Sequence, residues 1–166
     1  MPEPESPSPI SLDSVNLLAD LCEELLRQGK SVRFHAPGRS MYPTIRESEL
    51  ITVEPIEPPC VKVGDIVLYR HDRSVVAHRV VRINSSEPET PPSCMLDSRH
   101  LSLVTRHSFV TRDDTWGKQN ALVEGEQILG KVVRVERNGR EISPYTRKAK
   151  LRLLIHTLGS RLERLF

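Results

Sequence analysis

Six short segments rich in β-branched residues constrain the fold of this chain more than any other feature. Proline, glycine, aspartate or serine separates them, and these residues interrupt strands. The segments are SVRFHA (31–36), ELITVE (49–54), GDIVLYR (64–70), SVVAHRVVRI (74–83), HSFVTR (107–112) and QILGKVVRVER (127–137). HDRS (71–74) is typical of a hairpin with a four-residue connection. The sequence therefore predicts a mainly β domain of bent antiparallel strands over residues 30–145.

Two amphipathic helices are predicted to flank this domain. Over residues 11–29, apolar residues recur every three or four positions, Ser11 or Asp13 can cap the start, and Gly29 stands just past the end. Over residues 146–166, leucines and one isoleucine form a single helical face. Two roles stay open for this second helix: packing on the β domain, or contact with a membrane surface or a partner protein.

The second helix carries most of the positive charge. Residues 146–166 hold six basic residues and one acidic residue, a net of +5, and the whole chain carries +2, so the first 145 residues carry −3. This body has no global basic field, and we expect no nucleic-acid partner. A basic tail on a slightly acidic body instead predicts a surface or partner contact made by the tail.

No segment has the pattern of a targeting or membrane-spanning sequence. The leader (1–10) lacks a cationic start and an apolar run, and its composition predicts disorder. No apolar run reaches the roughly 20 residues that span a bilayer. Residues 84–106 lose the strand pattern and are predicted to be a loop insertion. The three cysteines, Cys22, Cys60 and Cys94, have no metal-ligand spacing, so we expect reduced thiols, no cofactor and a cytoplasmic protein.

The segment GRSMYPTI (38–45), which we call the serine turn, holds a candidate nucleophile. A serine hydroxyl attacks a carbonyl only when a neighbouring base takes its proton. Pro43 fixes one backbone angle and can hold Ser40 at a strand edge, and Gly38 permits close approach of a substrate backbone. We assign Gly38, Met41 and Pro43 to substrate or oxyanion binding. All of these are also ordinary turn residues, so the segment alone only nominates Ser40.

His78 is the most favourable base among the six histidines. Val76 and Val80 lie two residues to either side of it and therefore share its strand face. An imidazole on an apolar wall shifts toward its neutral form, which a general base needs. A buried histidine with a structural role is the alternative. His71 and His35 are predicted to be solvated.

Taken in order, SMYPTI, GDIVLYR, VVAHRVVRI, FVTRDD and QILGKVVRV resemble the S26 signal peptidases and the wider fold that they share with LexA-like self-cleaving repressors. The resemblance covers residues 31–136. It implies a LexA/signal peptidase-like β fold with flanking helices. It also implies a serine-type endopeptidase with Ser40 as nucleophile and His78 as base, as in the histidine branch of the family.

The same resemblance implies an acidic residue behind the base. TRDD (111–114) matches the TKGD segment of the histidine branch, which makes Asp114 the expected carboxylate and Asp113 the alternative. Asn120 falls where that branch has a second aspartate, and Gly38 falls where many signal peptidases carry a serine. An asparagine can orient an imidazole but cannot neutralise its charge, so the departures lower the expected activity.

The sequence thus predicts a soluble endopeptidase that cleaves a precursor peptide or protein through a Ser/His(/Asp) site. The first alternative is a catalytically weak or inactive peptide-binding module of the same fold. The second is a self-cleaving LexA-like regulator. It is the least favoured, because the residues before the β domain offer one helix and not the two of a helix-turn-helix.

Overall fold

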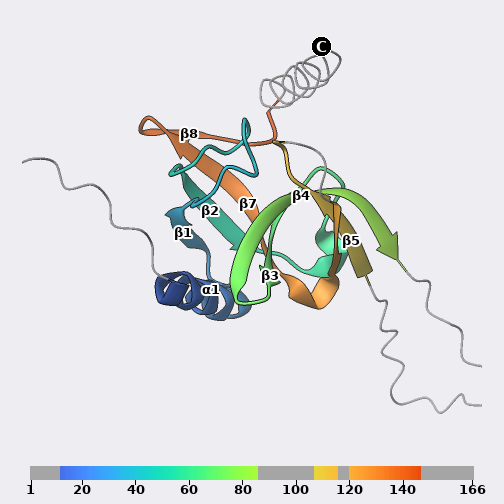
Figure 1. The fold of residues 1–166 in the computed structure, drawn as a ribbon. Coiled ribbons are helices and arrows are strands. Elements are labelled where there is room, and N and C mark those ends of the chain that lie inside the picture. Colours follow the sequence, from blue (N-terminus) through green and yellow to red (C-terminus); the bar gives the residue numbers. More distant parts are fainter. Residues whose placement is uncertain (1–11, 86–106, 116–119, 147–166) are drawn as a thin grey trace, which may run out of the picture.

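One curled antiparallel sheet dominates the structure, a computed structural model that describes residues 12–85, 107–115 and 120–146 (Figure 1). Within these residues the sheet has eight strands in the spatial order β1-β2-β7-β3-β4-β5-β6, and β8 pairs with β7. The sheet curls into a half-barrel. The prediction of a mainly β fold built from bent antiparallel strands is confirmed for the described residues.

All six predicted segments contain a strand, and two further strands were not predicted. The strands are β1 (Val32–His35), β2 (Leu50–Pro55), β3 (Ile66–His71), β4 (Ser74–Ser85), β5 (His107–Arg112), β6 (Asn120–Glu124), β7 (Ile128–Arg137) and β8 (Arg140–Ile142). The 3-10 turns are η1 (Pro58–Cys60) and η2 (Gly125–Gln127). The missed strands are β6 and β8, which have only five and three residues. An Asn-Gly pair between β7 and β8, with φ of 52° and 70°, is the hairpin signal that could have revealed β8.

The predicted four-residue connection between β3 and β4 is wrong. His71 pairs with Ser74, so the connection has only two residues, Asp72 and Arg73. Asp72 adopts a φ of 51°, the left-handed conformation that two-residue hairpin turns require and that aspartate tolerates better than most residues. The pairing of β3 with β4 begins directly at this turn, so the turn fixes the register of the two strands.

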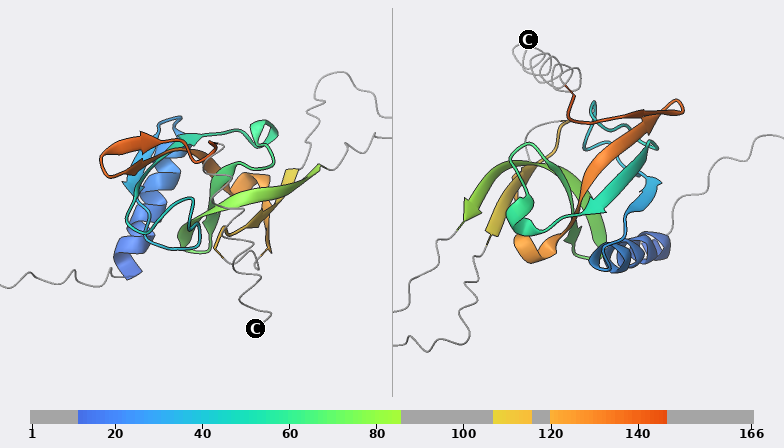
Figure 2. Two further views of the ribbon diagram at one scale, coloured as in Figure 1. Left: turned by 90° about the horizontal axis from the view of Figure 1, so that it is seen from above. Right: turned by 180° about the vertical axis from the view of Figure 1, so that it is seen from behind.

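The helix α1 (Leu12–Arg27) lies within the predicted range 11–29 and covers one end of the sheet. Cys22 and Leu26 pack from α1 into a buried cluster with residues of β2 and β7. Gly130 of β7 lies so close to β2 that an added Cβ would meet Val53 Cγ1 at 2.7 Å. Figure 2 shows α1 near one end of the curled sheet and strand β5 toward the other end.

The central strand β3 is buried on both of its faces. Ile66 and Leu68 belong to the cluster under α1, whereas Val67 and Tyr69 belong to a second cluster on the opposite face. A strand covered on both sides needs apolar residues at every position, which explains the continuous run IVLY. The two clusters form the core that holds β4 beside β3.

The last described segment returns to the middle of the sheet. The Tyr145 hydroxyl donates to the Val132 carbonyl oxygen at 2.6 Å and accepts the Ile66 amide at 3.1 Å. Lys131 Nζ lies 5.0 Å from the centre of the Tyr145 ring and 2.7 Å from Asp65 Oδ1. The Tyr145 side chain thus links β3 and β7 at the end of the paired stretch of these two strands.

Several predictions concern residues outside the described ranges: the leader, most of the loop insertion 84–106, Cys94, and the second helix beyond residue 146. The two described cysteines are free thiols; Cys22 is buried and Cys60 is exposed. Among the described helices, none is long and apolar enough to cross a membrane.

Candidate functional site

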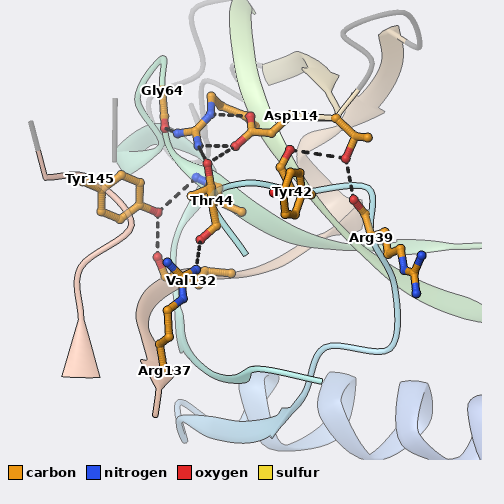
Figure 3. Close-up of polar contacts among 11 residues, drawn as sticks. Arg39, Tyr42, Thr44, Gly64, Asp114, Val132, Arg137 and Tyr145 are labelled. Carbon is orange, nitrogen blue, oxygen red and sulfur yellow. Dashed lines mark hydrogen bonds and ion pairs between the residues drawn. The ribbon is translucent and has the colours of Figure 1, made fainter. Parts of the chain in front are cut away.

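The backbone of Ser40 is held by the segment that follows β5. The Ser40 carbonyl oxygen accepts hydrogen bonds from the amides of Asp114 at 2.9 Å and Thr115 at 3.1 Å. The Thr115 hydroxyl donates to the Arg39 carbonyl oxygen at 2.5 Å (Figure 3). Three hydrogen bonds therefore fix the start of the serine turn, while the Ser40 residue itself is exposed.

A buried ion pair holds the other end of the serine turn. Arg79 of β4 donates to both oxygens of Asp114, from Nε at 2.8 Å and from Nη2 at 2.6 Å. Thr44 Oγ1 donates to Asp114 Oδ2 at 2.5 Å. The third arm of the guanidinium, Nη1, donates to the Gly64 carbonyl oxygen at 2.8 Å (Figure 3). A bidentate pair of this kind fixes geometry as well as charge, so the serine turn is fastened to β4.

A second arginine supports the same turn from β7. Arg137 Nη2 donates to the Thr44 carbonyl oxygen at 3.3 Å, and the guanidinium forms an ion pair with Glu49 (Figure 3). The hydrogen bond to Arg137 helps to lower the pKa of Glu49, against the effect of its burial. Both ends of Thr44 are thereby occupied, its hydroxyl by Asp114 and its carbonyl by Arg137.

His78 lies on the other face of β4, half-buried beside the second core cluster. Val80 is fully buried in that cluster and Val76 packs against it, as the alternation predicted. The Tyr69 hydroxyl lies 3.2 Å from His78 Nδ1, and the two rings meet edge to face with centroids 6.0 Å apart. Among the described residues, the histidine therefore has mainly apolar surroundings and one hydrogen-bond partner.

Burial is the main influence on His78 and lowers its pKa from the ordinary value of 6.5. The carboxylates of Asp113 and Asp114 act in the opposite direction, and His71 adds to the lowering. The imidazole is consequently neutral at neutral pH, in the form that can accept a proton.

The resemblance implied that the Asp114 carboxylate lies behind His78. Its carboxylate is bound by Arg79 and Thr44, and among the described residues no hydrogen bond joins it to the imidazole. Asp113 is better placed to influence His78. Arg79 pairs with Arg112 in the β4–β5 ladder, so the next position outward brings Asp113 opposite His78.

Ser40 and His78 approach the same short segment of the chain, residues 113–114. Ser40 is bonded to the backbone of Asp114, and His78 lies opposite Asp113. Within the described part of the chain, no hydrogen bond joins the Ser40 hydroxyl to the His78 ring. Catalysis would require a change of side-chain rotamers, which is common in ligand-free sites.

An apolar cavity of about 170 Å³ opens beside the serine turn. Gly38, Ser40 and Met41 line one side of it, and Val76 and Ala77 of β4 line another. Gly38 and Met41, which the sequence analysis assigned to substrate or oxyanion binding, are thus among the lining residues. Pro43, by contrast, is not among the lining residues; it follows Tyr42 through a cis peptide bond.

The remaining candidates lie at the surface. His35 is exposed, with Nδ1 2.9 Å from the Ser48 carbonyl oxygen, and His71 is exposed at the end of β3. Asn120 is exposed at the start of β6, where it pairs with Arg112. Among the described residues, no group of three His, Cys, Asp or Glu side chains is arranged to hold a metal ion.

Sequence reasoning did not identify Thr44, Tyr69 or Arg79 as parts of the site. Arg79 directly follows the candidate base, which offered a weak signal. Its partner lies 35 residues away, and only the register of β4 against β5 brings the two together.

A scan against protein-family models and a search of curated proteins find no match for this chain. Its function must therefore be inferred from the site itself.

Proposed function

We propose that the chain is a serine-type endopeptidase of the signal peptidase-like type, which cleaves a precursor peptide or protein. The observation that carries the proposal is the position of Ser40 in the lining of an apolar cavity that is also lined by the part of β4 directly before His78. The curled antiparallel sheet is consistent with the LexA/signal peptidase-like type that the motifs imply. An apolar side chain of a bound peptide would fill the cavity and bring the following carbonyl to Ser40.

In the proposed reaction, Ser40 Oγ attacks the peptide carbonyl carbon while His78 accepts the hydroxyl proton. The C–N bond then breaks, and His78 gives that proton to the leaving amine. Water attacks the resulting ester by the same route and releases the carboxylate and the free serine. The backbone amide of Ser40 is the candidate donor to the oxyanion, because Gly38 has no hydroxyl to offer.

The charged contacts of the serine turn suit this role. Arg79 and Thr44 hold Asp114, and Asp114 holds the backbone of Ser40 through its amide. A nucleophile on a fixed backbone loses less freedom on reaching the attacking geometry than one on a mobile loop. The burial that keeps His78 neutral supplies the base.

A second candidate function is a peptide-binding module that uses the same cavity without cleavage. Two observations favour this alternative: among the described residues no hydrogen bond joins the Ser40 hydroxyl to the His78 ring, and Asp114 pairs with Arg79. Such a module would hold an apolar side chain in the cavity and have no use for the serine hydroxyl.

The deciding experiment incubates the full chain with a diverse peptide mixture and detects new termini by mass spectrometry. We expect cleavage by the wild type, at least 1,000-fold less by Ser40→Ala and by His78→Gln, and wild-type rates for the control Ser31→Ala. Ser31 is exposed and lies before β1. Cleavage that persists in Ser40→Ala would refute the proposed serine endopeptidase mechanism. If the wild type and Ser40→Ala retain peptides equally and neither cleaves them, the chain is a peptide-binding module.

A further inference from the structure

Two leucines on the outer side of α1 are exposed. Leu17 is 70% exposed and Leu21 is 54% exposed, whereas Leu18 and Leu25 of the same helix pack against the cluster under α1. Three other large apolar residues of the described part of the chain are exposed, and they lie on other segments: Tyr42, Val63 and Leu122. The helix α1 is therefore the described element on which two such side chains stand one turn apart.

Two carboxylates lie on the same side of α1. Asp20 and Glu24 are exposed, and Leu17, Asp20, Leu21 and Glu24 follow the i, i+3, i+4, i+7 spacing of one helical face. We call these four residues the outer stripe. Asp20 also pairs with Arg70 of β3 at 2.8 Å, but its side chain stays 67% exposed. The outer stripe thus offers apolar and negatively charged groups side by side.

The charge of the chain is divided between its two ends. Residues 1–27 hold six acidic residues and one basic residue, a net of −5, and residues 147–166 hold six basic residues and one acidic residue, a net of +5. The residues between them carry the remaining +2 of the chain. Opposite charges of this size attract each other, and the connecting chain keeps the two ends close.

The apolar residues of the segment 147–166 also need a partner. Their periodicity predicts one helical face, made of Leu151, Leu154, Ile155, Leu158, Leu162 and Leu165. An isolated helix gains little stability from its own hydrogen bonds, and packing of its apolar face supplies most of it. The leucines and basic residues of this segment match the outer stripe in both apolar and charged character.

The described chain ends beside the cluster that lies under α1. Tyr145 packs against this cluster, which contains Cys22 and Leu26 of α1, and the chain continues from there into residues 147–166. As a helix, these 20 residues would span about 30 Å, whereas the 16 residues of α1 span about 24 Å. The segment is therefore long enough to cover the outer stripe.

We propose that residues 147–166 dock on the outer stripe of α1 in the same chain, with leucines on leucines and basic side chains against Asp20 and Glu24. An anionic membrane would attract the same basic residues. The outer stripe has the advantage of being tethered to the segment, which gives it a high effective concentration. This docking does not depend on the proposed endopeptidase activity.

Hydrogen–deuterium exchange of the full chain, followed by mass spectrometry, tests the apolar part of the contact. We expect the amides of residues 151–165 to exchange about 10-fold or more slowly in the wild type than in the double variant Leu17→Ser/Leu21→Ser. The matched control is Leu122→Ser, which removes a leucine of similar exposure, 64%, from β6 and should leave this exchange unchanged.

The charged part of the contact is tested in the same way. Glu24→Lys should speed the exchange of residues 151–165, and Glu57→Lys, the same change at an exposed glutamate before η1, should not. Added salt should also speed this exchange in the wild type, because it screens exposed charges. Equal effects of the two lysine variants would refute the charge contact with the outer stripe.

Three outcomes would overturn the docking. The first is equal exchange of residues 151–165 in the wild type and in Leu17→Ser/Leu21→Ser. The second is slow exchange that appears only after vesicles of anionic phospholipid are added, since the segment would then bind a membrane. The third is protection that increases with protein concentration, which would place the segment on a second copy. Slow exchange in β3 and β7 shows that each variant is folded, and Glu24→Lys gives the decisive reading if the double variant unfolds.

Discussion

Neighbouring residues of β4 face two different environments. On one face, Arg79 enters a buried charged network with Asp114 and Thr44. On the other face, His78 meets Tyr69 and an apolar cluster, and its nearest hydrogen-bond partner is neutral. Side chains of successive strand residues point to opposite faces, so a single residue step separates a permanent cation from a titratable base.

The difference shows how one strand can supply both rigidity and reactivity. A bidentate ion pair fixes position but keeps its charges permanently, which suits the support of a backbone. A base must gain and lose a proton, and a strong ion pair with a carboxylate would hold it in the protonated form. Placing Asp114 against Arg79 fastens the serine turn and leaves His78 free to be neutral.

The largest effect should follow from breaking the charged face. Arg79→Met leaves the buried Asp114 carboxylate without its partner; the two side chains are 14% and 3% exposed. We expect a loss of about 3–5 kcal/mol in the free energy of unfolding, measured by urea denaturation. Arg33→Met, which breaks the surface pair with Glu136, should cost less than about 1 kcal/mol. Equal losses in the two variants would mean that the Arg79 network adds no special support.

The environment of His78 on the neutral face should be visible in the pH dependence of the free energy of unfolding. The folded state lowers the pKa of His78 below 6.5, mainly through burial. Below that pH the unfolded chain binds a proton at His78 that the folded chain does not, until the folded pKa is passed. The free energy of unfolding should therefore fall as the pH falls through this window, and His78→Gln should remove that part of the dependence. Identical pH profiles for the two proteins would contradict the environment described for His78.

The smallest change should come from the carboxylate opposite the base. Asp113 raises the pKa of His78 against the effect of burial, so Asp113→Asn should lower that pKa further. An NMR titration of the His78 ring measures the shift directly, and any acid limb of the cleavage rate should move to lower pH with it. Glu136→Gln in β7 is the control and should leave the titration unchanged. A raised pKa in Asp113→Asn would show that Asp113 does not act on His78 through its charge.

The sequence predicted the features of this site that depend on local periodicity. Alternation along residues 74–83 placed His78 with Val76 and Val80, and composition located six of the strands. The sequence could not show which acidic residue lies opposite His78, because a bulge between Val80 and Arg82 changes the register of β4 against β5. Tyr69 belonged to a continuous apolar run, in which nothing distinguishes a core residue from one that contacts the base.

The position of Tyr145 has a mechanical consequence. Its hydroxyl links the Val132 carbonyl to the Ile66 amide, and burial raises the pKa of Tyr145 to about 12, so this link keeps its proton under physiological conditions. Force applied to the chain beyond Tyr145 is therefore transmitted to β3 and β7 in the middle of the sheet, before it reaches the short edge strand β8. The end of the described chain is thus anchored at the strands that also carry Tyr69 and support Thr44.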